Sequence, residues 1–117
     1  MTYTGGCHCG RVAFEVETDT EISSAMECNC SICSKRGHLL TFVPAAQVRL
    51  RTPETDLSSY TFNKHAIRHR FCTVCGVAPF AHASDRQGNP MFAINVRCLE
   101  GVDPQALEIK QFDGRSL

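Results

Sequence analysis

At 117 residues, the chain has room for one domain and one hydrophobic core, which its 43% of apolar residues can supply. Its 12 basic residues balance its 12 acidic residues, and this zero net charge disfavours broad electrostatic binding to nucleic acid. No apolar run reaches membrane-spanning length, and residues 1–6 lack the basic and apolar stretches of a signal peptide. We therefore expect a cytoplasmic protein with no membrane partner.

Short strands separated by turn residues follow one another along the chain. Val12, Phe14 and Val16 alternate with other residues, which is typical of a half-buried strand. Further strands are predicted over residues 39–43, 48–51, 57–63, 67–72, 78–83, 91–98 and 107–112, with a turn at 85–90 that closes a hairpin. This pattern predicts a mainly β fold of short antiparallel strands.

Little helical structure is expected from the sequence. Helical turns are expected only in the loop after Cys30 and over residues 45–47. No repeat, linker or low-complexity segment divides the chain, so residues 1–117 are interpreted as a single domain.

Eight cysteines are the most unusual feature of the composition. A reducing cytosol disfavours stable disulfides, so clustered cysteines in a cytosolic protein indicate metal ligands. They form three clusters and one isolated residue: Cys7 with Cys9, Cys28 with Cys30 and Cys33, Cys72 with Cys75, and Cys98 alone.

Cys72 and Cys75 form a C-x-x-C motif followed by Gly76, which allows the backbone to turn sharply around an ion. Structural zinc has four tetrahedral ligands, so this pair needs two more thiolates. Cys7 and Cys9 can supply them if the turn before the first strand lies beside the motif. The spacing thus predicts a closed four-cysteine zinc site.

Cys28, Cys30 and Cys33 can present three thiolates from one loop, and no neighbour at regular spacing offers a fourth. Three protein ligands and an open position are typical of catalytic zinc, whereas a complete set of four is typical of structural zinc. Two interpretations stay open at this point. Cys98 completes this second site, or it is an ordinary buried cysteine and the site is open.

Charged and aromatic residues near the clusters have competing interpretations. Lys35, Arg36 and Arg97 are candidates for binding an anionic substrate, with solvent-exposed charges as the alternative. His38 is a candidate proton donor or fourth ligand, with a histidine at the surface or at the start of a strand as the alternative. The side chain of His8, which lies between two candidate ligands, is expected to point away from that zinc. Structural or core roles are expected for His69, His82, Phe42, Phe71, Phe80 and Phe92.

Four segments together resemble the glutathione-dependent formaldehyde-activating enzyme family, which also includes centromere protein V. The order and spacing of these segments match the family over nearly the whole chain. They are Gly5-Gly6-Cys7-His8-Cys9-Gly10, Cys28-Asn29-Cys30-Ser31-Ile32-Cys33, Phe71-Cys72-Thr73-Val74-Cys75-Gly76 and Asn95-Val96-Arg97-Cys98-Leu99.

The resemblance implies a β-tent of antiparallel sheets, similar to that of a guanine-nucleotide-releasing chaperone. It implies two zinc ions, one structural and one catalytic. The structural ion is held by Cys7, Cys9, Cys72 and Cys75, and the catalytic ion by Cys28, Cys30 and Cys33, with Cys98 outside both ligand sets.

The implied activity is that of a carbon–sulfur lyase or synthase resembling S-(hydroxymethyl)glutathione synthase, which joins glutathione or a similar thiol to a small aldehyde. The alternatives are a zinc-stabilised domain that binds a protein without chemistry, and a thiol sensor whose cysteines are oxidised. A nucleic-acid partner is not expected, since the chain has no basic stripe.

Overall fold

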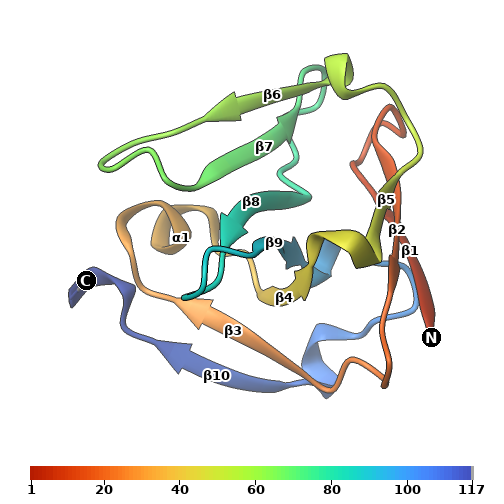
Figure 1. Cartoon of the computed structure of the whole chain (residues 1–117). Coiled ribbons are helices and arrows are strands. Elements are labelled where there is room, and N and C mark those ends of the chain that lie inside the picture. Colours follow the sequence, from red (N-terminus) through yellow and green to blue (C-terminus); the bar gives the residue numbers. More distant parts are fainter. Residues whose placement is uncertain (117) are drawn as a thin grey trace.

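The computed structural model describes residues 1–116, and in that range ten short strands form two sheets (Figure 1). The smaller sheet has the order β1-β2-β5 and consists of β1 (Thr2–Gly6), β2 (Ala13–Glu17) and β5 (Val48–Leu50). The larger sheet has the order β10-β3-β4-β9-β8-β7-β6. Its strands are β3 (Ser24–Cys28), β4 (Leu40–Pro44), β6 (Leu57–Tyr60), β7 (Arg68–Cys72), β8 (Phe80–Ser84), β9 (Pro90–Asn95) and β10 (Glu108–Phe112). The expected mainly β fold is confirmed.

Helical structure is sparse but more widespread than the sequence predicts. The helix α1 (Ser31–Arg36) follows Cys30, as expected. The 3₁₀ turns are η1 (Ala45–Gln47), η2 (Glu54–Asp56), η3 (Val96–Cys98), η4 (Pro104–Ala106) and η5 (Gly114–Ser116). The expectation of only two helical stretches is therefore wrong, because single turns that follow Pro53, Asn95 or Asp103 show no helical periodicity.

Two strands were missed and two end earlier than predicted. β1 contains two glycines, and β3 has the adjacent apolar residues Ala25 and Met26 between the polar Ser24 and Glu27, so neither shows the apolar alternation that the prediction requires. β6 ends at Tyr60 because the chain then turns through Asn63 and His65, which both have positive φ. β9 ends at Asn95, whose side chain accepts a hydrogen bond from the Arg97 backbone and starts η3.

The strand pairs are antiparallel with one exception in the described chain. β10 runs parallel to β3, with Phe112 opposite Cys28. In Figure 1 the two arrows lie side by side at the edge of the larger sheet, and the C-terminal end lies near α1. This pairing brings the end of the described chain to the Cys28–Cys33 loop.

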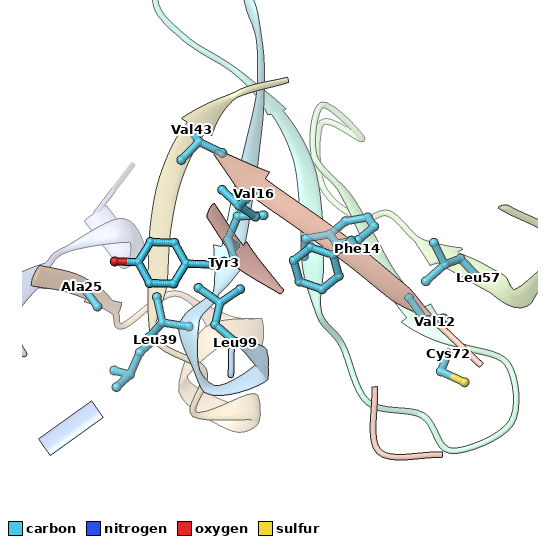
Figure 2. Close-up of a cluster of buried hydrophobic side chains, with 13 residues drawn as sticks. Tyr3, Val12, Phe14, Val16, Ala25, Leu39, Val43, Leu57, Cys72 and Leu99 are labelled. Carbon is cyan, nitrogen blue, oxygen red and sulfur yellow. The ribbon is translucent and has the colours of Figure 1, made fainter. Parts of the chain in front are cut away.

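The main core lies where the two sheets meet, and alternating residues of β2 supply its centre. Phe14 and Val16 are buried, as is Val12 just before the strand, which confirms the predicted alternation. The ring of Phe14 meets that of Phe80 on β8 edge to face, with centroids 5.4 Å apart. Figure 2 shows Val12, Phe14 and Val16 together with Leu99, which directly follows η3.

Gly5 allows this close contact between distant parts of the chain. A Cβ atom at Gly5 would lie 2.6 Å from Phe14 and 2.8 Å from the carbonyl oxygen of Cys98. Gly5 also forms an isolated bridge to Leu99. Within residues 1–116, no helix has the length and apolar character needed to cross a membrane.

Candidate metal centres and an adjoining cavity

The first cysteine cluster joins the two sheets. Cys7 and Cys9 lie in the loop between β1 and β2, whereas Cys72 ends β7 and Cys75 lies in the turn after it. Their four sulfur atoms are all within 4.8 Å of one another. The structure thus brings together the four residues that the spacing grouped.

The sulfur geometry of this cluster fits a tetrahedral ion. The Sγ atoms of Cys7 and Cys9 are 3.6 Å apart, as are those of Cys9 and Cys72. Four sulfurs placed 2.3 Å from zinc lie about 3.8 Å from one another, close to these values. All eight cysteines are free thiols, so this cluster could hold a metal ion.

Backbone amides point at these sulfurs because both loops turn tightly. The N–H of Val12 donates to Cys7 Sγ at 3.3 Å, and that of Val74 donates to Cys72 Sγ at 3.4 Å. The turn closes through Gly76, which has φ of +79° and donates to the Cys72 carbonyl. Such amides stabilise thiolates, which are the form that binds metal.

The thiols of this cluster differ in acidity. The backbone N–H groups of Val77 and Cys9 lower the pKa of Cys75 to about 6. For Cys9, the Arg11 N–H favours the thiolate, but desolvation and the neighbouring thiols outweigh it and raise the pKa to about 11. A cation is therefore needed to keep all four sulfurs ionised together.

Cys98 lies on the side of the first cluster and is not part of either metal-binding group among residues 1–116. Burial raises its pKa to about 11, with a further contribution from Cys7 and Cys75. Its Sγ is 4.0 Å from the Ala78 carbonyl oxygen. The alternative in which Cys98 completes the second site is therefore wrong, because η3 turns this residue toward the other end of the larger sheet.

The second cluster is formed by a single loop. Cys28 ends β3, Cys30 immediately precedes α1, and Cys33 lies in the first turn of that helix. The helix brings Cys30 and Cys33 together, since residues three apart lie on one face. The three sulfurs are within 4.8 Å of one another, so this group also could hold a metal ion.

The three thiols are not equivalent. Burial alone would raise the pKa of Cys30, but hydrogen bonds from the Cys33 backbone and thiol lower it overall. Burial raises the pKa of Cys33, and the negative charge of Cys30 adds to this effect. The Cys33 thiolate therefore needs a positive charge beside it more than the Cys30 thiolate does.

His38 contacts the sulfur of Cys33. Its Nε2 is 3.1 Å from Cys33 Sγ. Its side chain is buried, so it is not a surface histidine, and it lies two residues before β4, near the strand start that was the other part of this alternative. Burial lowers the pKa of His38 to about 4, with smaller contributions from Arg36 and His69. The lowered pKa favours the neutral imidazole, whose Nε2–H could donate to a Cys33 thiolate held by a metal ion. Such contacts orient a ligand.

The C-terminal segment covers the other side of the loop through Asn29, which lies between two of the cysteines. Asn29 Nδ2 donates to Asp113 Oδ1 at 3.0 Å, and Asn29 Oδ1 accepts from the Arg115 backbone at 2.9 Å. A Cβ atom at Gly114 would lie 2.5 Å from Cys28 Sγ. The sequence analysis missed this contact, whose only local signal is a polar residue between two candidate ligands.

A cavity of about 320 Å³ adjoins the second cluster and is lined by all three of its cysteines. The large apolar side chains of its wall are Met26, Ile32, Leu40, Phe42, Phe62, Ile67, Phe80 and Phe112. The charged side chains of the wall, among residues 1–116, are Arg36 and Lys64. The arrangement combines three thiols with an apolar space and two cations.

Several candidate residues can now be placed relative to this cavity. Arg36 lines it, whereas Lys35 and Arg97 are exposed and do not belong to its wall. Phe42 is 44% exposed and lines the cavity, so the expectation of a core role is wrong for this residue. Phe80 belongs to the core and to the wall at once.

Three further histidines named in the sequence analysis, His8, His69 and His82, can also be placed. His8 is exposed between its two cysteines. His69 is buried, stacks on Phe62 with centroids 5.7 Å apart, and contributes to the cavity wall. His82 contacts Arg70 and the ring of Phe92. His69 and His82 thus take the structural roles expected, and His69 also lines the cavity.

Two comparisons with known proteins agree with this architecture. The chain is similar to a crystal structure of a Rhodobacter sphaeroides protein from a structural genomics programme, with a TM-score of 0.77 and 30% sequence identity. The match covers 94% of this chain and 100% of that chain. Residues 2–112 match the family described as glutathione-dependent formaldehyde-activating enzyme. With a match over nearly its whole length, the chain belongs to the glutathione-dependent formaldehyde-activating enzyme family.

Proposed function

We propose that the protein is a zinc-dependent carbon–sulfur lyase or synthase that joins glutathione, or a similar thiol, to a small aldehyde. The observation that carries this proposal is the group of three thiols, Cys28, Cys30 and Cys33, that opens onto a cavity. Three protein ligands and a free position characterise catalytic zinc. Family membership supports the choice of thiol and aldehyde.

The donor set favours thiol chemistry over hydrolysis. Three thiolates around a divalent ion leave a net charge of minus one, which disfavours the strong activation of water that hydrolases require. Zinc in this soft environment would supply a positive charge that keeps an incoming thiol in its thiolate form. The cavity would then hold the aldehyde beside that sulfur, so much of the rate gain would come from positioning.

Side chains around the cluster have distinct roles in this proposal. His38 holds Cys33 in place through the Nε2–Sγ contact. Arg36 and Lys64 offer positive charges to the carboxylates of glutathione. The Arg36 guanidinium lies 5.9 Å from the centre of the Phe71 ring, a cation–π contact that holds it near the cavity.

The first cluster has a structural role in the same proposal. Cys7, Cys9, Cys72 and Cys75 form a complete set of four, which leaves no position for a substrate. They would hold a zinc ion that ties the smaller sheet to the larger one. The chain is then one zinc-binding domain with two ions, one structural and one catalytic.

Cobalt provides a direct test, because its absorption spectrum reports how many sulfurs surround it. Protein loaded with Co²⁺ at both sites is titrated with glutathione, and the Cys30→Ser variant is the matched control. We expect a change toward four-sulfur coordination that is lost in the variant. A spectrum that ignores glutathione would contradict the proposal and favour the alternative of a protein-binding domain without chemistry.

Turnover requires a separate assay, since thiols add to aldehydes without a catalyst. Exchange between free glutathione and its formaldehyde adduct can be measured at equilibrium by NMR. We expect the exchange rate to rise in proportion to the concentration of zinc-loaded protein. An unchanged rate, with glutathione nevertheless bound to the metal, would indicate a thiol-binding sensor in place of an enzyme.

A further inference from the structure

The cavity beside Cys28, Cys30 and Cys33 is larger and more apolar than formaldehyde requires. We propose that it binds the apolar substituent of a larger aldehyde, either a linear chain of about six carbons or a phenyl group. This inference rests on the proposed function, because it assigns the aldehyde for the same site. Glutathione would lie toward the charged opening, and the aldehyde substituent would lie inside.

The interior wall offers little to a polar ligand. Leu40, Ala81 and Ala93 are buried and form part of the wall. The buried amide of Asn95 is already used, since Nδ2 donates to the Ala78 carbonyl and Oδ1 accepts from the Arg97 backbone. The deep wall is thus formed mainly by hydrocarbon side chains, which favours an apolar group of the ligand over a polar one.

The imidazoles of the wall do not change this conclusion. His38 Nε2 lies 3.1 Å from Cys33 Sγ, so this nitrogen is already occupied by the cluster. His69 presents a stacked ring beside Phe62, and burial followed by the charge of Arg36 lowers its pKa. Both rings are therefore already in contact with other side chains of the protein.

Charge is confined to the opening. Arg36 and Lys64 are both exposed, and no carboxylate lines the cavity in the described part of the chain. Glutathione carries two carboxylates, which these cations can bind at the surface while its sulfur reaches the cysteines. Phe42, Ile67 and Phe112 are 44%, 46% and 40% exposed around the same cavity. A bound apolar group would remove part of this exposed surface from water.

The volume sets the size of the substituent. An apolar cavity of roughly 150 Å³ is enough to bind benzene. The cavity of about 320 Å³ therefore accommodates a phenyl or hexyl group with space left for the reacting atoms. Formaldehyde has no carbon substituent and would leave most of the apolar wall uncovered.

The reaction itself needs no further reagent. The glutathione sulfur forms a bond to the carbonyl carbon, and the C=O π bond breaks with its electron pair going to oxygen. That oxygen takes a proton equivalent to the one released by the thiol, so neither oxidation nor reduction occurs. A longer substituent changes the binding of the aldehyde and leaves this balance unaltered.

Stable thioethers test the inference apart from catalysis. Binding of S-methylglutathione and S-hexylglutathione to the zinc-loaded protein is measured by titration calorimetry, with hexan-1-ol as a third probe. Each buried methylene contributes about fourfold to affinity, so we expect the hexyl compound to bind at least roughly tenfold more tightly. Its heat-capacity change should also be more negative.

Two alanine variants locate the binding site. Ala83 is half-buried in β8 and lines the cavity, so Ala83→Leu should fill part of the space. We expect it to weaken the hexyl compound roughly tenfold and the methyl compound less than about twofold. Ala13, half-buried in β2 and outside the wall, provides the matched control through Ala13→Leu. The wild-type comparison remains decisive if either variant folds poorly.

The outcomes separate this inference from the proposed function. Equal binding of the methyl and hexyl compounds would overturn the apolar-aldehyde assignment and leave glutathione as the thiol. Binding of hexan-1-ol that Ala83→Leu weakens, without binding of either glutathione derivative, would support the cavity assignment and contradict the choice of thiol. Absence of binding by all three probes would overturn both.

Discussion

The two cysteine clusters contrast in how much of the chain each one closes. Cys9 and Cys72 are 63 residues apart in sequence, yet their sulfurs are 3.6 Å apart. The second cluster consists of one local loop between Cys28 and Cys33. By the loop-entropy estimate used for disulfides, closing the longer loop raises the free energy of the unfolded chain by about 4 kcal/mol. Closing the shorter loop raises it by about 2 kcal/mol.

The two clusters also differ in their surroundings. The first cluster uses four cysteines from two sheets, and its buried member Cys72 belongs to the main core. The second uses three cysteines and lines a cavity. A cluster that joins distant segments stabilises the fold. A local cluster beside a cavity can be altered at little cost in folding free energy, so it is free to take part in chemistry.

The largest expected effect is loss of folding in Cys72→Ser. The Cys72 side chain is only 1% exposed, and structural zinc contributes roughly 10–16 kcal/mol to folding in small domains. This exceeds most of the roughly 5–15 kcal/mol by which a whole domain is stable. We expect circular dichroism to show a disordered or strongly destabilised chain. A cooperative melt near that of the wild type would remove the distinction between the clusters.

The next effect is loss of turnover without loss of fold in Cys30→Ser. Cys30 is half-buried in a local loop, so the serine should shift the unfolding free energy by roughly 1 kcal/mol or less. The exchange rate of the formaldehyde adduct should fall at least about 100-fold, because one ligand is missing. Thermal melts and exchange NMR on the same sample check both parts. Unfolding as severe as that of Cys72→Ser would contradict separate roles.

Gly114→Ala should have an intermediate effect, on metal binding at the second cluster and not at the first. The added Cβ would lie 2.5 Å from Cys28 Sγ and 3.2 Å from Cys30 Cβ, so the loop or the C-terminal segment must shift. We expect metal affinity at this cluster to fall by roughly 10- to 100-fold, as for other changes behind metal ligands. Competition with a chelator, followed by cobalt absorption, measures this affinity.

Gly101→Ala is the control for this variant. Gly101 has φ of +76° and free space around it, so alanine there strains the backbone without touching either cluster. Both variants should lose roughly 1 kcal/mol of stability or more. A similar loss of metal from both would show that general destabilisation, and not contact with Cys28, is responsible.

The smallest expected effect is a pH dependence that arises outside both clusters. His82 Nε2 lies 3.0 Å from Arg70 Nη1, and burial followed by the charges of Arg70 and Arg68 lowers the pKa of His82. The folded protein thus favours the neutral imidazole, which accepts a hydrogen bond from Arg70. Its stabilising contribution is fully present above the unfolded pKa of about 6.5 and is lost as pH falls below that value.

Urea unfolding of the wild type and of His82→Gln between pH 7.5 and 5.5 measures this contribution. The wild type should lose more unfolding free energy than the variant as the pH falls, because only the wild type gains a charge at this position. Acid release of metal from the cysteines affects both proteins equally. Identical slopes would show that the cysteine clusters account for the whole pH dependence.

The strand pattern and the cysteine groups could be predicted from the sequence because they rest on local periodicity and spacing. Val12, Phe14 and Val16 alternate as a half-buried strand, and the structure buries all three. The pairing of Cys7 and Cys9 with the Cys72–Cys75 turn followed from the need for four ligands. β1 and β3 escaped prediction because the glycines of β1 and the adjacent Ala25 and Met26 of β3 break the apolar alternation, and their pairing depends on hydrogen bonds to segments distant in the chain.

What only the tertiary structure decided concerns contacts between segments far apart in the chain. The spacing of the cysteines did not predict whether Cys98 is a ligand of the second cluster, because the position of its side chain depends on the turn η3. Asp113 contacts Asn29, and Gly114 lies against Cys28, only because β10 pairs in parallel with β3. Phe42 is apolar and predicts a core position, yet it lines a cavity whose wall is assembled from six strands of the larger sheet. Local chemistry thus determined which side chains could bind metal, and packing decided what lies beside them.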